Sequence, residues 1–399
     1  MRSLSLAACV APAMATGTEL PLPDGLRALV RSAVADHPEV RAAQARVRAA
    51  EARRDGAARP LYNPELQLDA QRTSTGSNSL EAGLSQALDW HGKQAARTVG
   101  SEHELALARA GLVTVRARLA GELLAALRRC EEERAQRDLV QAQHDLLARF
   151  TRLTERRARA GGVPPAAVRL ARLAVRQMAL ELASSEAAAG VQVLGAGGCP
   201  EPGLFPALPP DLPKALAEGL DERHPELQEL AVAVTAAQAQ IRQADTERRA
   251  DPSLGLRLGR DAGENLVGLS FALPLQVRND YRETVRAARA AHAEALAGLA
   301  AARQRLEATL DGSVRRLHRL HRAWEEWMAG SGASGSFDRD GELERLWRAG
   351  ELDTGDYLQQ LQQALDTRAA AESLRAALWT AWLDTWAASG LLSRWIEEE

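Results

Sequence analysis

Two pairs of short alternating segments decide the fold of this chain. The first pair is NPELQLDA at residues 63–70 with LEAGLSQAL at residues 80–88, and the second is DPSLGLRL at residues 251–258 with LVGLSFALPL at residues 266–275. Apolar residues alternate in them with small or polar ones, and Pro, Gly, Asn and Asp bound them, which is typical of half-buried β-hairpins. Strands are therefore predicted at about 64–72, 79–89, 252–260 and 265–276.

Most of the remaining chain has the composition of long helices. Only 4% of the 399 residues are aromatic, whereas 26% are charged, with Arg interleaved among acidic residues as on solvated helix faces. Residues 94–160 contain no Pro and keep a continuous apolar period, Gly161-Gly162 interrupts them, and Pro164-Pro165 suits the start of a returning helix. Helical hairpins are predicted at about 94–190 and 280–389, the second interrupted near residues 330–336.

The same landmarks occur twice in nearly constant register. His37-Pro38-Glu39 recurs 187 residues later at 224–226, Pro64 recurs as Pro252 after 188, and Arg159-Ala160-Gly161 recurs after 189 at 348–350. Such a register indicates an internal duplication. We predict a mainly α chain of duplicated helix-hairpin-helix halves: a first repeat at 16–194, a Gly/Pro linker at 195–213, a second repeat at 214–390 and a tail at 391–399.

Residues 1–15 are predicted to be a signal peptide. Arg2 gives a positive start, residues 4–14 are apolar, and Ala13-Met14-Ala15 suits cleavage. LAAC at residues 6–9 also fits a lipoprotein box, so a lipid anchor at Cys9 stays open as the alternative. The other cysteines, Cys130 and Cys199, lie in no spacing framework that assigns a disulfide. No later apolar run reaches 18 residues, so any membrane-spanning part must consist of strands.

Composition and motifs exclude several functional classes. The net charge of −3 is no polyanion-binding signature, and no catalytic triad, phosphate loop or nucleotide fingerprint occurs, so neither an enzyme nor a cofactor is predicted. His318 and His321 share a helix face without a further ligand, so no metal site is predicted. Trp379, Trp382 and Trp386 are predicted to pack in the helical core. We interpret the scarcity of Lys, present only at 93 and 214, as a genomic base-composition effect.

Taken in order, the motifs resemble those of a known family. The repeated HPE openings, NPEL and DPSL at the strand starts, LSFALPLQVRND at residues 269–280 and RAGELDTGDYL at residues 348–358 resemble the outer-membrane factor (TolC-like) family of bacterial efflux systems, most of all its heavy-metal-efflux branch. The resemblance covers roughly residues 25–390. It implies a homotrimer in which each chain adds four strands to a twelve-stranded transmembrane β-barrel. A long periplasmic helical barrel would continue it and dock onto a periplasmic adaptor and an inner-membrane pump of the RND type.

The resemblance also implies where the functional residues lie. The two helical turns would ring the periplasmic mouth, act as its gate and meet the adaptor, and they comprise Arg159, Gly161, Val163, Arg348, Gly350, Leu352, Asp353 and Asp356. Pairing of Arg and Asp across these turns is expected to hold the mouth partly closed; the alternative is that the two glycines only end helices. The predicted lipid-facing strand residues are Val267, Leu269, Phe271 and Leu273. The aromatic girdle is expected to be thin, with Tyr62, Trp90 and Phe271 as its nearest candidates.

The expected function is passive conduction through an outer-membrane exit duct, with heavy-metal cations as one candidate substrate. Most of the chain would lie in the periplasm. Two alternatives are a periplasmic adaptor and a structural helical-hairpin protein. Duplication of both hairpins argues against the adaptor, and the alternating face of residues 267–275 argues against a purely coiled-coil protein.

Overall fold

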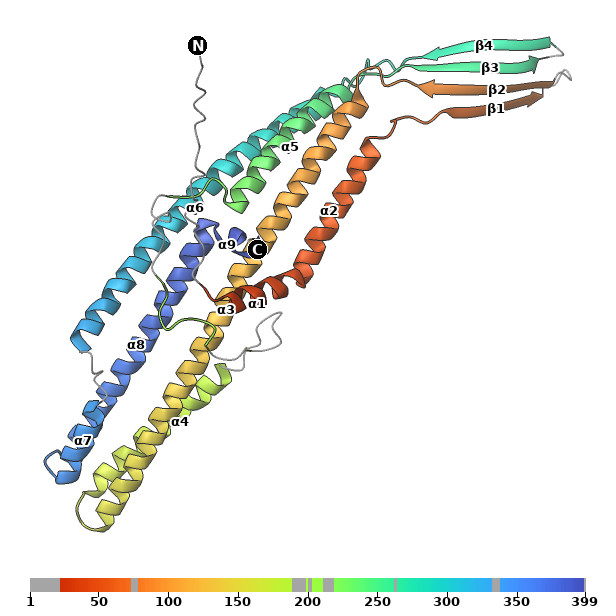
Figure 1. Ribbon diagram of the computed structural model, residues 1–399. Helices are drawn as coiled ribbons and strands as arrows, with labels where there is room; N and C mark the ends of the chain where they lie inside the picture. The colour runs from red at the N-terminus through yellow and green to blue at the C-terminus, as the bar shows by residue number, and fades with distance from the viewer. Residues whose placement is uncertain are drawn as a thin grey trace, which may run out of the picture.

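The computed structural model shows an elongated molecule with a β-sheet at one end and helices along the rest of its length (Figure 1). It describes residues 22–72, 78–188, 199, 203–210, 219–261, 264–331 and 338–397. The predicted signal peptide with Cys9 lies outside the described residues, as do Lys214, most of the linker and the last two residues of the tail.

The element order repeats itself. In chain order the elements are α1 Asp24–Ala35, α2 Pro38–Ala57, β1 Glu65–Arg72, β2 Asn78–Ala87, α3 Lys93–Arg159, α4 Pro165–Ala188, α5 Pro225–Glu247, β3 Ser253–Asp261, β4 Glu264–Ala272, α6 Arg282–Ser331, α7 Asp338–Ala349, α8 Thr354–Ser389 and α9 Leu392–Glu397. Thus α2, β1, β2 and α4 of the first repeat correspond to α5, β3, β4 and α8 of the second. The single helix α3 corresponds to α6 and α7 together. The predicted class of duplicated helix-hairpin-helix halves is confirmed.

Local sequence explains where the helices begin. The Nδ1 atoms of His37 and His224 each accept a hydrogen bond from the backbone N–H two residues later, at 3.2 Å, and Pro follows at the first helical position of α2 and α5. The carboxylate of Asp89 accepts the backbone N–H groups of Lys93 and Gln94 at 2.7 and 2.8 Å, which satisfies the first turn of α3. The two histidines thus cap the helices that lead into the strand hairpins, and Asp89 stabilises the start of the helix that follows the first hairpin.

The four strands form one antiparallel sheet in the order β1-β2-β3-β4. The central pairing of β2 with β3, from Ser79 opposite Asp261 to Ala87 opposite Ser253, joins the two repeats. In the described chain β1 and β4 are therefore edge strands, each with one side that has no strand partner.

Helix α3 is the spine of the helical part. Near the sheet it lies beside α2 and α5, and farther away it lies beside α4 and α8, whereas α6 packs on α5 and α8 (Figure 1). The largest apolar cluster surrounds the middle of the molecule, where α1 and α9 cross the long helices. Trp379, Trp382 and Trp386 are fully buried there, so the predicted core role is confirmed. None of the helices in the described ranges has both the length and the apolar character needed to cross a membrane.

Candidate functional site

One face of the sheet is apolar across both repeats. Each strand contributes three residues to it: Leu66, Leu68 and Ala70 from β1; Leu80, Ala82 and Leu84 from β2; Leu254, Leu256 and Leu258 from β3; and Val267, Leu269 and Phe271 from β4. The register aligns them in rows, one of which runs Leu66, Leu84, Leu256, Leu269. Leu269 is 89% exposed and Leu68 is 70% exposed, so this single-chain face is uncovered.

The opposite face carries polar and small residues. Gly255 and Gly259 lie on it, and a Cβ added at either would come within 2.8 Å of a neighbouring strand's atoms, namely the Ser270 hydroxyl for Gly255 and the Leu80 carbonyl oxygen for Gly259. Side chains larger than that of Gly therefore do not fit at these two positions. The sheet has an apolar outer face and a polar inner face.

Three of the four predicted lipid-facing residues lie in strand β4, and the fourth lies beyond its end. Val267, Leu269 and Phe271 lie on the apolar face of β4, but Leu273 follows the end of that strand and is half-exposed. Strand β4 ends at Ala272, before the predicted end, because its partner β3 begins at Ser253 opposite Ala272 and Pro274 has no N–H to donate to a ladder.

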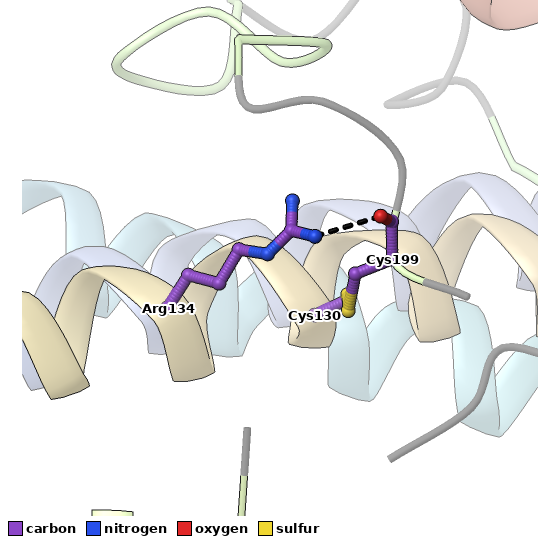
Figure 2. The surroundings of a disulfide bond; sticks show 3 residues. All are labelled: Cys130, Arg134 and Cys199. Carbon is purple, nitrogen blue, oxygen red and sulfur yellow. Dashed lines mark hydrogen bonds between the residues drawn. A yellow bond between two sulfur atoms is a disulfide. The ribbon is translucent and has the colours of Figure 1, made fainter. Parts of the chain in front are cut away.

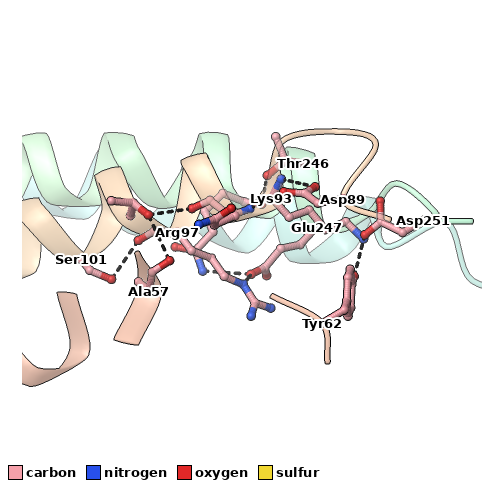
Figure 3. A network of polar contacts seen from close by, with 12 residues as sticks. Ala57, Tyr62, Asp89, Lys93, Arg97, Ser101, Thr246, Glu247 and Asp251 are labelled. Atoms are coloured by element: carbon pink, nitrogen blue, oxygen red, sulfur yellow. Dashed lines mark hydrogen bonds and ion pairs between the residues drawn. The ribbon is translucent and has the colours of Figure 1, made fainter. Parts of the chain in front are cut away.

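A buried polar joint connects the sheet to the helices (Figure 3). The Tyr62 hydroxyl donates to Asp251 Oδ2 at 2.6 Å, and Lys93 Nζ lies 3.0 Å from the same oxygen. Burial raises the pKa of Asp251, but the hydrogen bonds from Tyr62 and Lys93 outweigh it, so the pKa lies below its usual value. Burial and the bond to Asp251 raise the pKa of Tyr62 to about 12.

This joint ties the first repeat, through Tyr62 and Lys93, to the start of β3 in the second. Nearby, Arg97 of α3 pairs with Glu247 of α5 at 2.9 Å, which adds a second link between the repeats (Figure 3). One of the two lysines of the chain, Lys93, thus pairs with a buried carboxylate. Tyr62 belongs to this joint, whereas Trp90, also named for the girdle, is 71% exposed.

At the other end of the molecule the two helical tips share one backbone motif. Gly161 ends α3 with φ 78°, and the next N–H, of Gly162, donates to the Arg157 carbonyl at 2.9 Å. Gly350 ends α7 with φ 84°, and the next N–H, of Glu351, donates to the Leu346 carbonyl at 3.0 Å. Both are helix-ending Schellman motifs that need a left-handed residue. The duplication therefore extends to individual hydrogen bonds.

The other predicted tip residues occupy definite places. Arg159 is the last residue of α3, Val163 lies in the first turn, Leu352 packs on the nearby apolar cluster, and Asp356 lies in the first turn of α8. Arg348 pairs with Glu344 one turn earlier in α7.

Asp353 is the N-cap of α8, where its Oδ2 accepts the Gly355 N–H at 2.8 Å. Within one chain, Asp353 therefore interacts with the start of α8, and Arg348 pairs with Glu344 of its own helix α7. Among the described residues of one chain, no ion pair joins Arg159 or Arg348 to Asp353 or Asp356. Because replacing an Asp N-cap costs about 0.5–2 kcal/mol, replacing Asp353 by a residue that cannot cap is expected to destabilise the start of α8.

Sequence reasoning missed the residues that join the tips. Arg157 of α3 donates to the carbonyls of Trp347 and Arg348 at 3.0 and 2.6 Å, and its guanidinium lies 4.5 Å from the Trp347 ring centroid. The Trp347 ring packs on Phe150 and Tyr357 with centroids 4.9 and 5.4 Å apart. A lone Trp directly before the repeated Arg-Ala-Gly was the available signal. The two tips form one packed unit.

The linker between the repeats is fastened to α3 (Figure 2). Cys130 and Cys199 form a disulfide, and Arg134 Nη2 donates to the Cys199 carbonyl at 2.7 Å. Glu131 Oε1 accepts the backbone N–H groups of Gly203 and Leu204 at 3.0 and 2.8 Å. The sequence alone had left this pairing unassigned, because Cys199 lies in an irregular segment.

Comparison with known proteins identifies this architecture. Residues 29–192, which span most of the first repeat, match the family model described as outer membrane efflux protein. No curated protein matches by sequence. The outer-membrane channel OprN is similar in structure, with a TM-score of 0.75 and 19% identity over 92% of this chain and 90% of that one. CusC, whose structures were described in connection with folding and transmembrane channel formation, gives 0.71 and 14% identity over 93% of both chains.

VceC, an outer membrane protein of Vibrio cholerae, gives a TM-score of 0.70 and 18% identity over 92% of this chain and 96% of that one. The likeness covers both repeats at nearly full length of each relative. The chain therefore has the fold of the outer-membrane efflux channels, and its first repeat matches that family by sequence as well.

Proposed function

We propose that this chain is one protomer of a trimeric outer-membrane exit duct in a tripartite efflux system. The observation that carries the proposal is the apolar sheet face, which runs without a change of register across both hairpins and is exposed in the single chain. Water is a poor environment for so many adjacent leucines, whereas lipid is a suitable one.

The sheet edges support closure by further copies. An open edge in hydrocarbon leaves backbone donors and acceptors unpaired at a cost of several kcal/mol each, and here β1 and β4 are both edges. Three copies of this four-stranded sheet supply twelve strands, within the range of closed membrane barrels. The polar inner face would then line a water-filled lumen, and the long helices would extend it through the periplasm.

Conduction through such a wall is passive. In this proposal an RND-type pump in the inner membrane supplies the energy, and a periplasmic adaptor docks at the two tips, around Arg159, Val163, Leu352 and Asp356. The joining of the tips through Arg157 and Trp347 supports their moving as one unit when the mouth opens.

The test of the duct is fractionation followed by electrophoresis with and without heating. We expect a heat-modifiable trimer in the outer membrane and stepwise conductance when the purified trimer enters planar bilayers. A soluble periplasmic monomer would contradict the proposal. Intact-mass measurement of the mature chain separates cleavage after Ala15, which we favour, from lipidation at Cys9.

Gating at the tips needs a pair of variants at one position. Asp353→Asn keeps an N-cap and removes the charge, whereas Asp353→Arg removes both. If Arg–Asp pairs between neighbouring copies restrain the mouth, both variants raise single-channel conductance and only the second lowers tip stability. Unchanged conductance in both, together with unchanged adaptor crosslinking, removes Asp353 from the gate.

For the substrate we propose heavy-metal cations, on the motif resemblance to the heavy-metal-efflux branch. Deleting the gene and comparing sensitivity to zinc, cobalt, copper and hydrophobic drugs tests this. Greater sensitivity to the metals alone supports the branch, whereas greater sensitivity to the drugs alone assigns the duct to drug efflux.

A further inference from the structure

The apolar sheet face ends in the same way in both repeats. Beyond Leu68 and Ala70, the next outward position of β1 is Arg72; beyond Leu256 and Leu258, the next of β3 is Arg260. Arg72 is the last residue of β1 and Arg260 the last but one of β3, and both strands end away from the helices (Figure 1). The register places Arg72 opposite Asn78 and Arg260 opposite Asn265, so each hairpin ends its apolar face with the same pair of residue types.

Charge is sorted between the two faces of the sheet. Within the described strands the apolar face carries Arg72 and Arg260 and no carboxylate. The five acidic residues of the strands, Glu65, Asp69, Glu81, Asp261 and Glu264, occupy inner-face positions, because each alternates along its strand with the outward residues. Within the described strands, the charged residues at outward positions are therefore Arg72 and Arg260, both at the far end of the face.

The near end of the same face is different. On β2 the last outward position next to the helices is Gln86, which pairs with Leu254 of β3, and neither residue is charged. Arg72 and Arg260 are both exposed. An arginine at one boundary of an apolar band keeps its aliphatic stem along the hydrocarbon and extends its guanidinium into the headgroup layer.

We infer that Arg72 and Arg260 form a binding site for the phosphates of anionic lipid headgroups in the outer leaflet. This rests on the proposed function, which places the sheet in the membrane with its far end outward. The planar guanidinium can donate two parallel hydrogen bonds to a phosphate. Closure of three copies would give a ring of six arginines around the outer rim of the barrel.

The test compares lipid retention by purified full-length trimers in two kinds of vesicle: pure phosphatidylcholine, and an equal mixture of phosphatidylcholine and phosphatidylglycerol. Native mass spectrometry counts the lipids that each trimer keeps. The variant is R72Q together with R260Q. The matched control is R257Q, which removes an arginine from the same strand β3 on the inner face.

We expect wild type and R257Q to retain phosphatidylglycerol preferentially, and the double variant to lose roughly five-fold in preference for each arginine removed. The preference of wild type should fall with added salt. Equal retention by the double variant and wild type would overturn the inference, as would complete competition by millimolar inorganic phosphate, which would indicate a site for free anions. If wild type forms no trimer in either vesicle, the exit-duct proposal itself fails. If wild type forms a trimer that shows no lipid preference, only the lipid-site inference fails.

Discussion

The two repeats share their helix ends and their sheet, but they differ in their cores. His37 and His224 cap α2 and α5 in the same way, and Arg118 pairs with Glu39 as Arg305 pairs with Glu226, 187 residues later. In contrast, Trp347 in the second tip corresponds to Ala158 in the first, and α3 runs unbroken for 67 residues whereas α6 runs for 50.

The difference follows from position. Helix α8 of the second repeat packs between α3 and α6, whereas α4 of the first repeat lies on the outer side of α3 (Figure 1). Caps and turn motifs depend on local backbone geometry, so both repeats retain them. Core residues depend on how many neighbours surround a helix, so they diverged. In this molecule, the residues that are the same in both repeats are those that set local backbone geometry, and the residues that differ are those that pack in the cores.

Removing the largest divergent side chain should give the largest effect. Trp347 is 1% exposed, and Trp347→Ala removes its contacts with Phe150, Tyr357 and Arg157. We expect a loss of about 3–5 kcal/mol in the stability of the second tip, measured as faster hydrogen exchange in α7 and the start of α8.

The sheet should keep its exchange rates in this variant. Trp90→Ala is the control, because Trp90 is 71% exposed and its removal should change stability by no more than about 0.5 kcal/mol. Uniform destabilisation of tip and sheet by Trp347→Ala would show that the cores of the two ends are not independent.

The second prediction concerns the shared sheet. Leu269→Arg puts a cation in the middle of the apolar face and should cost roughly 2–4 kcal/mol of insertion free energy. Ser270→Arg, one residue later on the inner face, should insert normally. The yield of heat-modifiable trimer in the outer membrane measures both, and equal yields would reject the assignment of the faces.

The third prediction tests whether the tips are equivalent. Gly161 and Gly350 have φ of 78° and 84°, and no atom lies within 4 Å of a Cβ added at either. Alanine there should therefore meet only the backbone penalty, about 1–2 kcal/mol at each site. Thermal unfolding of G161A and G350A should give equal losses. A much larger loss at one site would mean that its turn makes contacts that its counterpart lacks.

The smallest effect is expected from the two capping histidines. Burial lowers the pKa of His224, with partial opposition from Glu226 and Asp221, and its ring lies so close to Gly390 that a Cβ there would come within 2.6 Å. A lowered folded pKa means that the unfolded chain binds the proton more tightly. His224 therefore contributes its full stability above about pH 6.5, the ordinary value, and loses it as the pH falls below that toward the folded pKa.

His224→Asn keeps an N-cap and removes this titration. The drop in melting temperature between about pH 7.5 and about pH 5.5 should become smaller in H224N. The same change at His37 is the matched control, because it replaces the equivalent histidine cap of α2. Identical drops in wild type and H224N would remove His224 as a source of the acid sensitivity.

The sequence predicted the parts of this fold that have a local signal. Period-two alternation located the strands, and Gly161 and Gly350 located the tips, because a left-handed turn favours one residue type. Contacts between distant segments had no such signal. Tyr62 with Asp251 and Arg157 with Trp347 join residues 189 and 190 positions apart. Both contacts join one repeat to the other, and no local pattern around either partner points to the other.

The disulfide of the linker affects the two tips differently, because it covalently bridges the chain on both sides of the first tip but not of the second. Cys130 and Cys199 are 69 residues apart, and the first tip lies inside the loop that they close, whereas the second tip lies outside it. A protease that nicks the chain at Gly162 would leave the two fragments linked until a reductant is added. A nick at Glu351 would release the C-terminal fragment without one. Cleavage patterns on reducing and non-reducing gels would thus report which mouth turn was cut.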